Sequence, residues 1–322
     1  MSTSDLTLTG DVLPAAEPAS ATLSEADRAA LRRAVLALER PGLAARLSAA
    51  AGAPLDIIGR SLPTPVTEAV GRSTEAAMRG ALRVALATLP ATEVVPAGGT
   101  AIEAATARTE GRLARLLGGG EAKHKALAAV SGAVGGAFGL ATLAVELPVS
   151  TTLMLRSIAE IAREEGENLD SPEGALACVQ VFALGGGKGA LSGALSGTLA
   201  AEAGPALTES GYFAVRAALA KTMAEAARYA GSKTLLDQSA PALMRFTAQI
   251  AARFGIVVSQ KVAAQAVPIL GALGGAAVNT AFMNHFQSTA RAHFTVRRLE
   301  RAYGAAAVRA AYEVEKAALG AA

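Results

Sequence analysis

Glycines recur at helical spacing inside a long stretch without charge, and this pattern limits what the chain can fold into. The stretch runs from Ala126 to Val145 and contains Gly132, Gly135, Gly136 and Gly139. Residues three or four apart lie on one face of a helix, and glycines leave that face without side chains, so a second helix can approach closely. The pattern therefore predicts tightly packed helices around this stretch.

The composition agrees with a helical core built from small side chains. Of 322 residues, 52% are hydrophobic, 4% are aromatic, none is tryptophan and 33 are glycine. The chain is too apolar to be disordered as a whole. Because large rings are scarce, we expect alanine, leucine and valine to fill the core. No useful alternating strand pattern appears, so the predicted class is all-α, a multi-helix globular bundle with Gly/Ala-rich, closely packed helical hairpins.

The chain divides into three segments by composition. Residues 1–22 carry acidic residues and prolines and lack the basic and apolar parts of a signal peptide, so we expect a disordered tail of a cytoplasmic protein. Residues 23–120 are expected to form N-terminal helices. Residues 121–322 are expected to form a helical core that continues from them as one domain.

Capping residues predict where several helices begin. Ser24 followed by Asp27 resembles a capping box, Thr64 precedes a first-turn proline, and Ser171 precedes another. The helix predicted to begin at Thr64 carries two pairs in which an acidic residue precedes a basic one by four positions: Glu68 with Arg72, and Glu75 with Arg79. Such pairs indicate an exposed helix face.

Prolines and a glycine are predicted to interrupt helices. Glu146 and Pro148 are expected to turn the chain directly after the uncharged run, which at roughly 20 residues is long enough to span a bilayer. A buried or half-inserted hairpin fits the run better than a clean span, because few of its side chains insert strongly. A helix that begins at Pro241 is expected to end near Gly255, and Pro268 is expected to kink the next one.

The glycine pattern returns near the C-terminus. The sequence GALGGA, which begins at Gly271, matches GAVGGA, which begins at Gly132. Chance similarity in a chain rich in alanine and glycine is the alternative to a true repeat. Either origin predicts close helix crossing at the same glycines: Gly132, Gly135, Gly136, Gly271, Gly274 and Gly275.

Basic side chains precede the uncharged stretch. Arg108, Arg112 and Arg115 recur at helical spacing, and Lys123 and Lys125 follow. A solvated helix face is one interpretation. The other is contact with anionic lipid headgroups, which contributes roughly 1 kcal/mol for each basic residue near a membrane surface. A formal net charge of only +3 without dense basic and aromatic patches argues against nucleic acid as a partner.

A second group of charges follows the uncharged run. Glu146, Arg156 and Glu160 lie on one helix-like segment. They form either an ion network that fixes helix register or the polar lining of a pocket that receives a headgroup.

Residues for catalysis or metal binding form no recognisable set. His285 and His293 lie eight residues apart, which is too far on a helix for both to bind one zinc ion, and no HExxH motif is present. No GxSxG motif frames a serine. Cys178 is the only cysteine, and its apolar neighbours are typical of a packed, inert thiol. We therefore assign no catalytic residue, no metal site and no cofactor.

Several blocks of the chain resemble the EcsC protein family. They are ELPVSTTLMLRSIAEIAREEGENL, SPEGALACVQVFALGGG, SGYFAVRAALA and the segment from RFGIVVSQ to ERAYG. The resemblance covers roughly Glu121 to Glu315, and residues before Arg60 lie outside it. It implies a bacterial, mostly helical protein that is linked by name to an ABC exporter and associates with membranes. A peptidase label accompanies some such sequences, and no residue here supports it.

Three functions remain open at this point. The first is a non-enzymatic protein that docks on the cytoplasmic face of the inner membrane, binds lipid and has a membrane-protein partner such as an ABC exporter. The second is a hydrolase that acts near lipids, which needs a serine beside His285 or His293. The third is a soluble helical adaptor whose apolar grooves bind a partner helix.

Overall fold

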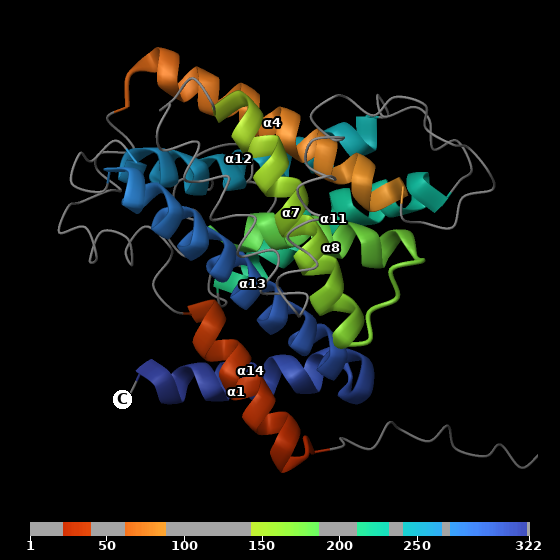
Figure 1. Cartoon of the computed structure of the whole chain (residues 1–322). Helices are drawn as coiled ribbons and strands as arrows, with labels where there is room; N and C mark the ends of the chain where they lie inside the picture. The colour runs from red at the N-terminus through yellow and green to blue at the C-terminus, as the bar shows by residue number, and fades with distance from the viewer. Residues whose placement is uncertain are drawn as a thin grey trace, which may run out of the picture.

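A computed structural model describes residues 22–39, 62–87, 143–186, 211–231, 241–265 and 271–320. Within these ranges the chain forms helices joined by turns and contains no strand, so the predicted all-α class is confirmed. The helices are α1 (Glu25–Glu39), α4 (Thr64–Ala87), α7 (Leu143–Glu164), α8 (Pro172–Leu184), α11 (Gly211–Gly231), α12 (Pro241–Gln265), α13 (Gly271–Tyr303) and α14 (Ala305–Gly320) (Figure 1).

Side-chain caps begin two helices at the predicted positions. The hydroxyl oxygen of Ser24 accepts a hydrogen bond from the backbone N–H of Asp27 at 3.1 Å. Ser171 accepts one from the backbone N–H of Gly174 at 3.1 Å, and Pro172 occupies the start of α8. These bonds satisfy N–H groups that a helix start leaves without intrahelical partners. The predicted pairs of α4 are present as well: Glu68 with Arg72 at 3.5 Å and Glu75 with Arg79 at 3.6 Å.

Two glycines with positive φ end helices. Gly166 has a φ of 71° after α7, where the N–H of Glu167 donates to the carbonyl of Ala162 at 2.8 Å. This bond belongs to the Schellman pattern, in which glycine at the left-handed position ends a helix. Gly304 has a φ of 86° and separates α13 from α14. A side chain at either position would strain the backbone.

The core contains a cluster of phenylalanine rings. Phe182 on α8 and Phe254 on α12 meet edge to face, with ring centroids 5.1 Å apart. Phe282 and Phe286 on α13 complete the group, and all four side chains are buried. Alanine, leucine and valine make up most of the buried hydrophobic residues, as predicted, and half of the eight phenylalanines of the chain add a ring cluster to them.

The first and last of the described helices lie together. Figure 1 shows α1 crossing α14 at one end of the molecule, beside α13. The hydroxyl of Tyr303 donates to the carboxylate of Asp27 at 2.7 Å, and the hydroxyl of Tyr312 donates to Glu39 at 3.1 Å. At the other end of the molecule, α4 packs against both α7 and α12.

The chain does not turn at Glu146 and Pro148, contrary to the prediction. Both residues lie inside the first two turns of α7, which begins at Leu143. Pro148 is the sixth residue of α7, so its missing N–H removes one intrahelical bond, and the helix continues through it. Glu146 does not mark the end of a helix, and its carboxylate pairs with Lys261 of α12.

The helix that begins at Pro241 does not end near Gly255, which corrects a second prediction. α12 continues to Gln265, and α13 begins at Gly271. Gly255 faces α4: a Cβ placed on it would lie 3.8 Å from the methyl group of Thr74. The glycine therefore lies inside a continuous helix, where a Cβ would make only an ordinary contact with α4. Pro268 lies outside the described residues.

None of the described helices is both long enough and apolar enough to cross a membrane. Of the uncharged run from Ala126 to Val145, only its last three residues belong to the described part of the chain, at the start of α7.

Candidate functional site

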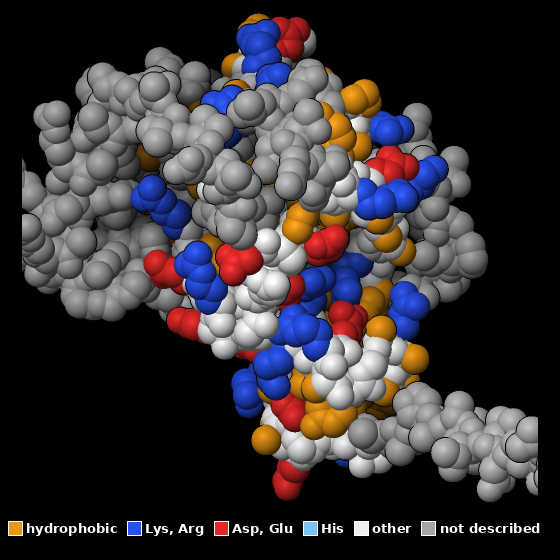
Figure 2. Space-filling model, turned by 90° about the vertical axis from the view of Figure 1, so that its right-hand side faces the viewer, with side chains coloured by type: hydrophobic (Ala, Val, Ile, Leu, Met, Phe, Trp, Pro, Cys, Tyr) orange, Lys and Arg blue, Asp and Glu red, His pale blue; other side chains and the backbone are white. Residues whose placement is uncertain are grey.

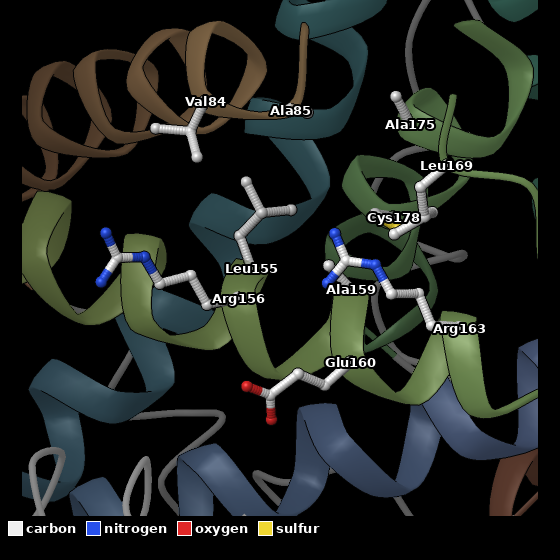
Figure 3. Close-up of a pocket in the computed structure, with 10 residues that line it drawn as sticks. All are labelled: Val84, Ala85, Leu155, Arg156, Ala159, Glu160, Arg163, Leu169, Ala175 and Cys178. Atoms are coloured by element: carbon white, nitrogen blue, oxygen red, sulfur yellow. The ribbon is translucent and has the colours of Figure 1, made fainter. Parts of the chain in front are cut away.

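A pocket opens between α4, α7 and α8. Its volume is about 170 Å³. Val84 and Ala85 of α4, Leu155 and Ala159 of α7, and Ala175 and Cys178 of α8 supply an apolar lining, which Leu169 completes. Three charged side chains of α7 complete the pocket: Arg156, Glu160 and Arg163 (Figure 3).

The spacing of residues along α7 explains why the pocket is apolar on one side and charged on the other. Arg156 and Arg163 are seven residues apart, so they lie two turns apart on the same face of the helix. Ala159 lies between them, and its small side chain leaves space above the helix. Figure 3 shows that Glu160 points away from Val84 and Leu155, whereas Arg163 extends back toward Ala159.

The charges of the pocket favour an anionic group at its edge. Arg156 and Arg163 are exposed, and Glu160 is half-buried. Two guanidinium groups against one carboxylate leave the lining with an excess of positive charge. Guanidinium groups bind carboxylates and phosphates through paired hydrogen bonds, so the pocket has apolar and anion-binding parts side by side.

Cys178 lines this pocket but is not reactive there. Its side chain is 2% exposed, and burial raises the pKa of the thiol to about 12. The thiolate is the nucleophilic form of cysteine. A thiol with this pKa acts as a small apolar surface, as the sequence suggested.

Glu146 is separate from the pocket, although it lies on the same helix as Arg156 and Glu160. Its Oε1 atom lies 2.7 Å from Nζ of Lys261 on α12, and Nζ also lies 5.1 Å from the centre of the Phe282 ring. The lysine side chain is 0% exposed. The sequence did not indicate this partner, because the two residues are 115 positions apart.

A buried arginine lies on the same helix as Lys261. Arg253 is 1% exposed, and within the described part of the chain its guanidinium group has no hydrogen-bond partner. Burial lowers its pKa. The sequence had not singled it out, since arginine in a helix is usually exposed.

The two histidines of α13 take part in different contacts. Nδ1 of His293 lies 2.9 Å from the hydroxyl of Tyr212. The same hydroxyl accepts a bond from Arg216 at 3.3 Å. Burial, followed by the charges of Arg216 and Arg297, lowers the pKa of His293 well below its usual value.

His285 contacts backbone, and two serines of α7 have other partners. Nε2 of His285 donates to the carbonyl of Gly185 at 2.6 Å. The hydroxyl of Ser157 accepts from Gln287 at 2.8 Å, and the hydroxyl of Ser150 donates to the carbonyl of Leu147 at 3.2 Å. These contacts satisfy helix and core polar groups and do not form a nucleophile and base pair.

An ion cluster that the sequence had not indicated joins the end of α7 to α13. Glu167 accepts bonds from Arg297 at 2.6 and 3.0 Å and also pairs with Arg301. Arg298 bridges Glu165 and Asp27, each at 3.0 Å. Burial opposes ionisation of Glu167, but the bonds and charges of its arginines outweigh burial and lower its pKa.

The face shown in Figure 2 carries basic and acidic side chains interspersed among each other. The described residues on it form no uniformly basic area. The residues predicted to contact lipid lie outside the described part of the chain: Arg108, Arg112, Arg115, Lys123 and Lys125. The same holds for Gly132, Gly135 and Gly136, whereas Gly271, Gly274 and Gly275 belong to the first turns of α13.

The chain was compared with protein families, with curated proteins and with solved structures. The model of the EcsC protein family matches residues 26–299. The match begins well before Arg60, so it includes N-terminal helices that the sequence blocks had left out. No curated protein and no solved structure showed a significant match. Since the family model spans most of its length, the chain belongs to the EcsC protein family.

Proposed function

We propose that the protein is a non-enzymatic lipid-binding protein that docks on the cytoplasmic face of the inner membrane. The observation that supports this most directly is the pocket between α4, α7 and α8, which combines an apolar lining with Arg156 and Arg163. An anionic amphiphile has the matching chemistry, with a hydrocarbon chain for the lining and a charged group for the arginines.

The size of the pocket limits what it holds. Its volume of about 170 Å³ lies below the range of about 300–1,000 Å³ that is usual for small-molecule sites. This space suits a short run of methylene groups and not a whole lipid. The pocket therefore receives a short stretch of an acyl chain, and the rest of a lipid stays outside.

The affinity of such a contact favours action at a membrane surface. Burying roughly six methylene groups at about 0.8 kcal/mol each contributes about 5 kcal/mol before the costs of association. Those costs, about 4 kcal/mol or more, offset most of this free energy, so burial in the pocket alone gives only weak binding. A contact this weak becomes effective where lipid is concentrated and other groups bind the same surface.

Flotation with vesicles tests the pocket. We expect the full chain to float with vesicles that contain anionic lipid. The double variant Arg156→Ala/Arg163→Ala should float less, and Ala159→Leu, which fills the pocket without a change in charge, should also float less. The matched control is Arg72→Ala/Arg79→Ala, which removes the same charge from an exposed face of α4. Equal loss in the control, or no effect in any variant, would overturn the role of the pocket.

Salt separates two modes of binding in the same assay. Charge reversal of Arg108, Arg112 and Arg115 should release the protein from anionic vesicles if these residues dock it electrostatically. Such binding should weaken with salt, because exposed charges are screened beyond about 10 Å at 0.1 M. Binding that resists both changes indicates insertion of apolar segments. Failure to bind vesicles under every condition contradicts the proposed function and favours a soluble adaptor.

A further inference from the structure

A second pocket, with a volume of about 450 Å³, lies between α1 and α13. Its α1 side consists of Ala30, Ala34 and Ala37 together with Arg33. These alanines recur at helical spacing toward α13, and because their side chains are small they leave a hollow between the two helices. The volume lies inside the usual range for small-molecule sites, about 300–1,000 Å³.

The α13 side of this pocket is a polar stripe. The polar side chains that line it are Asn284, Gln287, Ser288, Arg291, Thr295 and Arg298, and Ala292 lies among them. They recur every three or four residues, so one face of α13 presents amides, hydroxyls and guanidinium groups to the hollow. None of the described residues that line the pocket is aromatic, so these residues offer no ring on which a nucleobase could stack.

The described side chains that line the pocket carry an excess of positive charge: Arg33, Arg291 and Arg298 against Glu165. Glu165 is the acidic residue of its lining, and the protein itself already occupies both carboxylate oxygens: Thr295 donates to one at 3.0 Å and Arg298 pairs with the other at 3.0 Å. These contacts also fix the position of Arg298. Arg33 and Arg291 are exposed at the same pocket, one on each helix.

From this arrangement we propose that the groove between α1 and α13 binds a phosphate ester of a polyol. The guanidinium groups of Arg33 and Arg291 match the geometry of phosphate oxygens, and Arg298, which is held by Glu165 and Asp27, adds positive charge beside them. Amide and hydroxyl groups, supplied by Asn284 and Ser288 at the open side, match the hydroxyls of a polyol. A glycerol phosphate group has this chemistry, whether it is a free metabolite or the headgroup of a phospholipid. The site is distinct from the pocket between α4, α7 and α8.

Calorimetric titration of the full chain with glycerol 3-phosphate tests the site. Arg33→Ala and Arg291→Ala should each weaken binding by about tenfold or more, which is the usual effect of losing a charge-assisted hydrogen bond. Arg28→Ala is the matched control, because Arg28 is exposed on α1, carries the same charge and does not line the groove. Its affinity should equal that of the unmodified chain. Circular dichroism checks that each variant remains helical.

A second arm identifies the source of the phosphate ester. Vesicles of phosphatidylcholine with and without phosphatidic acid replace the soluble ligand in a flotation assay. Binding of glycerol 3-phosphate that depends on Arg33 and Arg291 supports a free metabolite. Binding only to phosphatidic acid vesicles, with the same dependence, supports a lipid headgroup. Absence of both, or equal losses in Arg28→Ala, overturns the proposal.

The outcome is independent of the proposed lipid-binding function. Arg156→Ala/Arg163→Ala changes the other pocket and should leave the affinity for glycerol 3-phosphate unchanged. Loss of soluble phosphate binding in that variant contradicts the assignment to the α1–α13 groove.

Discussion

Nζ of Lys261 lies 2.7 Å from Oε1 of Glu146, and the two side chains are 0% and 7% exposed. The pair joins α12 to the first turns of α7 inside an otherwise apolar region, against the ring of Phe282. Burying two charges is costly, and their mutual attraction roughly offsets that cost. Removing one of the two charges should therefore cost much more stability than replacing both with apolar side chains.

Lys261→Met should lower the free energy of unfolding by about 3–5 kcal/mol, because it leaves the carboxylate of Glu146 buried without its partner. The double variant Lys261→Met/Glu146→Leu should recover most of that loss or exceed the original stability. Urea unfolding of the single and double variants measures both values. A double variant no more stable than the single one would show that the pair itself stabilises the fold.

Glu167→Gln should destabilise the protein by about 3 kcal/mol at pH 7, because Arg297 and Arg301 lose a buried partner. The folded pKa of Glu167 lies below its usual value of 4.5, so the unfolded chain takes up a proton first as the pH falls. The stabilisation is therefore complete above about pH 4.5 and is lost as the pH falls through the folded pKa.

Stability measured by urea unfolding as a function of pH checks this prediction. The difference between the unmodified chain and Glu167→Gln should shrink below pH 4.5. Glu164→Gln makes the same change in charge at an exposed position of α7 and should have little effect at any pH. A constant difference across the whole range would contradict the assignment.

His293 should make stability depend on pH in a higher window. Its folded pKa lies well below the usual value of 6.5, so below pH 6.5 the unfolded state binds a proton that the folded state does not. Stability should fall by up to about 1.4 kcal/mol for each pH unit below that value. His293→Gln should remove this slope between pH 5 and 6.5, whereas Tyr212→Phe should keep it, because the imidazole stays buried. An unchanged slope in His293→Gln would refute the prediction.

Gly185→Ala should destabilise the protein by about 1–3 kcal/mol through overpacking. A Cβ at this position would lie 2.3 Å from the ring of Phe286, which is enclosed by other phenylalanines and cannot move aside. Gly80→Ala, inside α4, meets nothing within 4 Å and should raise stability by about 0.5–1 kcal/mol. Thermal unfolding compares the two, and a similar melting temperature for both variants would argue against the crowding at Phe286.

Helix starts were predictable from the sequence because their causes are local. Ser24 and Ser171 cap backbone groups three residues away, and the pairs of α4 lie one turn apart. The predictions at Gly255 and Pro148 were wrong because both residue types usually interrupt a helix, whereas here α12 and α7 continue through them. Local chemistry therefore predicted the class of the fold and most boundaries, but not how helices cross.

The candidate site depends on contacts between distant parts of the chain. Its apolar lining extends from Val84 to Cys178, and the ion cluster joins Glu167 to Arg297, 130 residues further on. Arg156 and Glu160 were identified from the sequence because they share one helix, but nothing local indicates that α4 and α8 close a pocket beside them. The pairing of Lys261 with Glu146 was not predictable, because a single lysine in an apolar helix has no spacing pattern that indicates its partner.

The contacts of α1 have a consequence for how the protein is made. Asp27 is held by Arg298 and Tyr303, 271 and 276 positions later, and Glu39 is held by Tyr312. A chain leaving the ribosome from its N-terminus therefore presents α1 long before its partners have been synthesised, and contacts this distant in sequence form slowly. Until α13 and α14 have been synthesised, the apolar face formed by Leu31, Ala34 and Val35 lacks the two helices that it packs against, so we expect it to be exposed in the nascent chain.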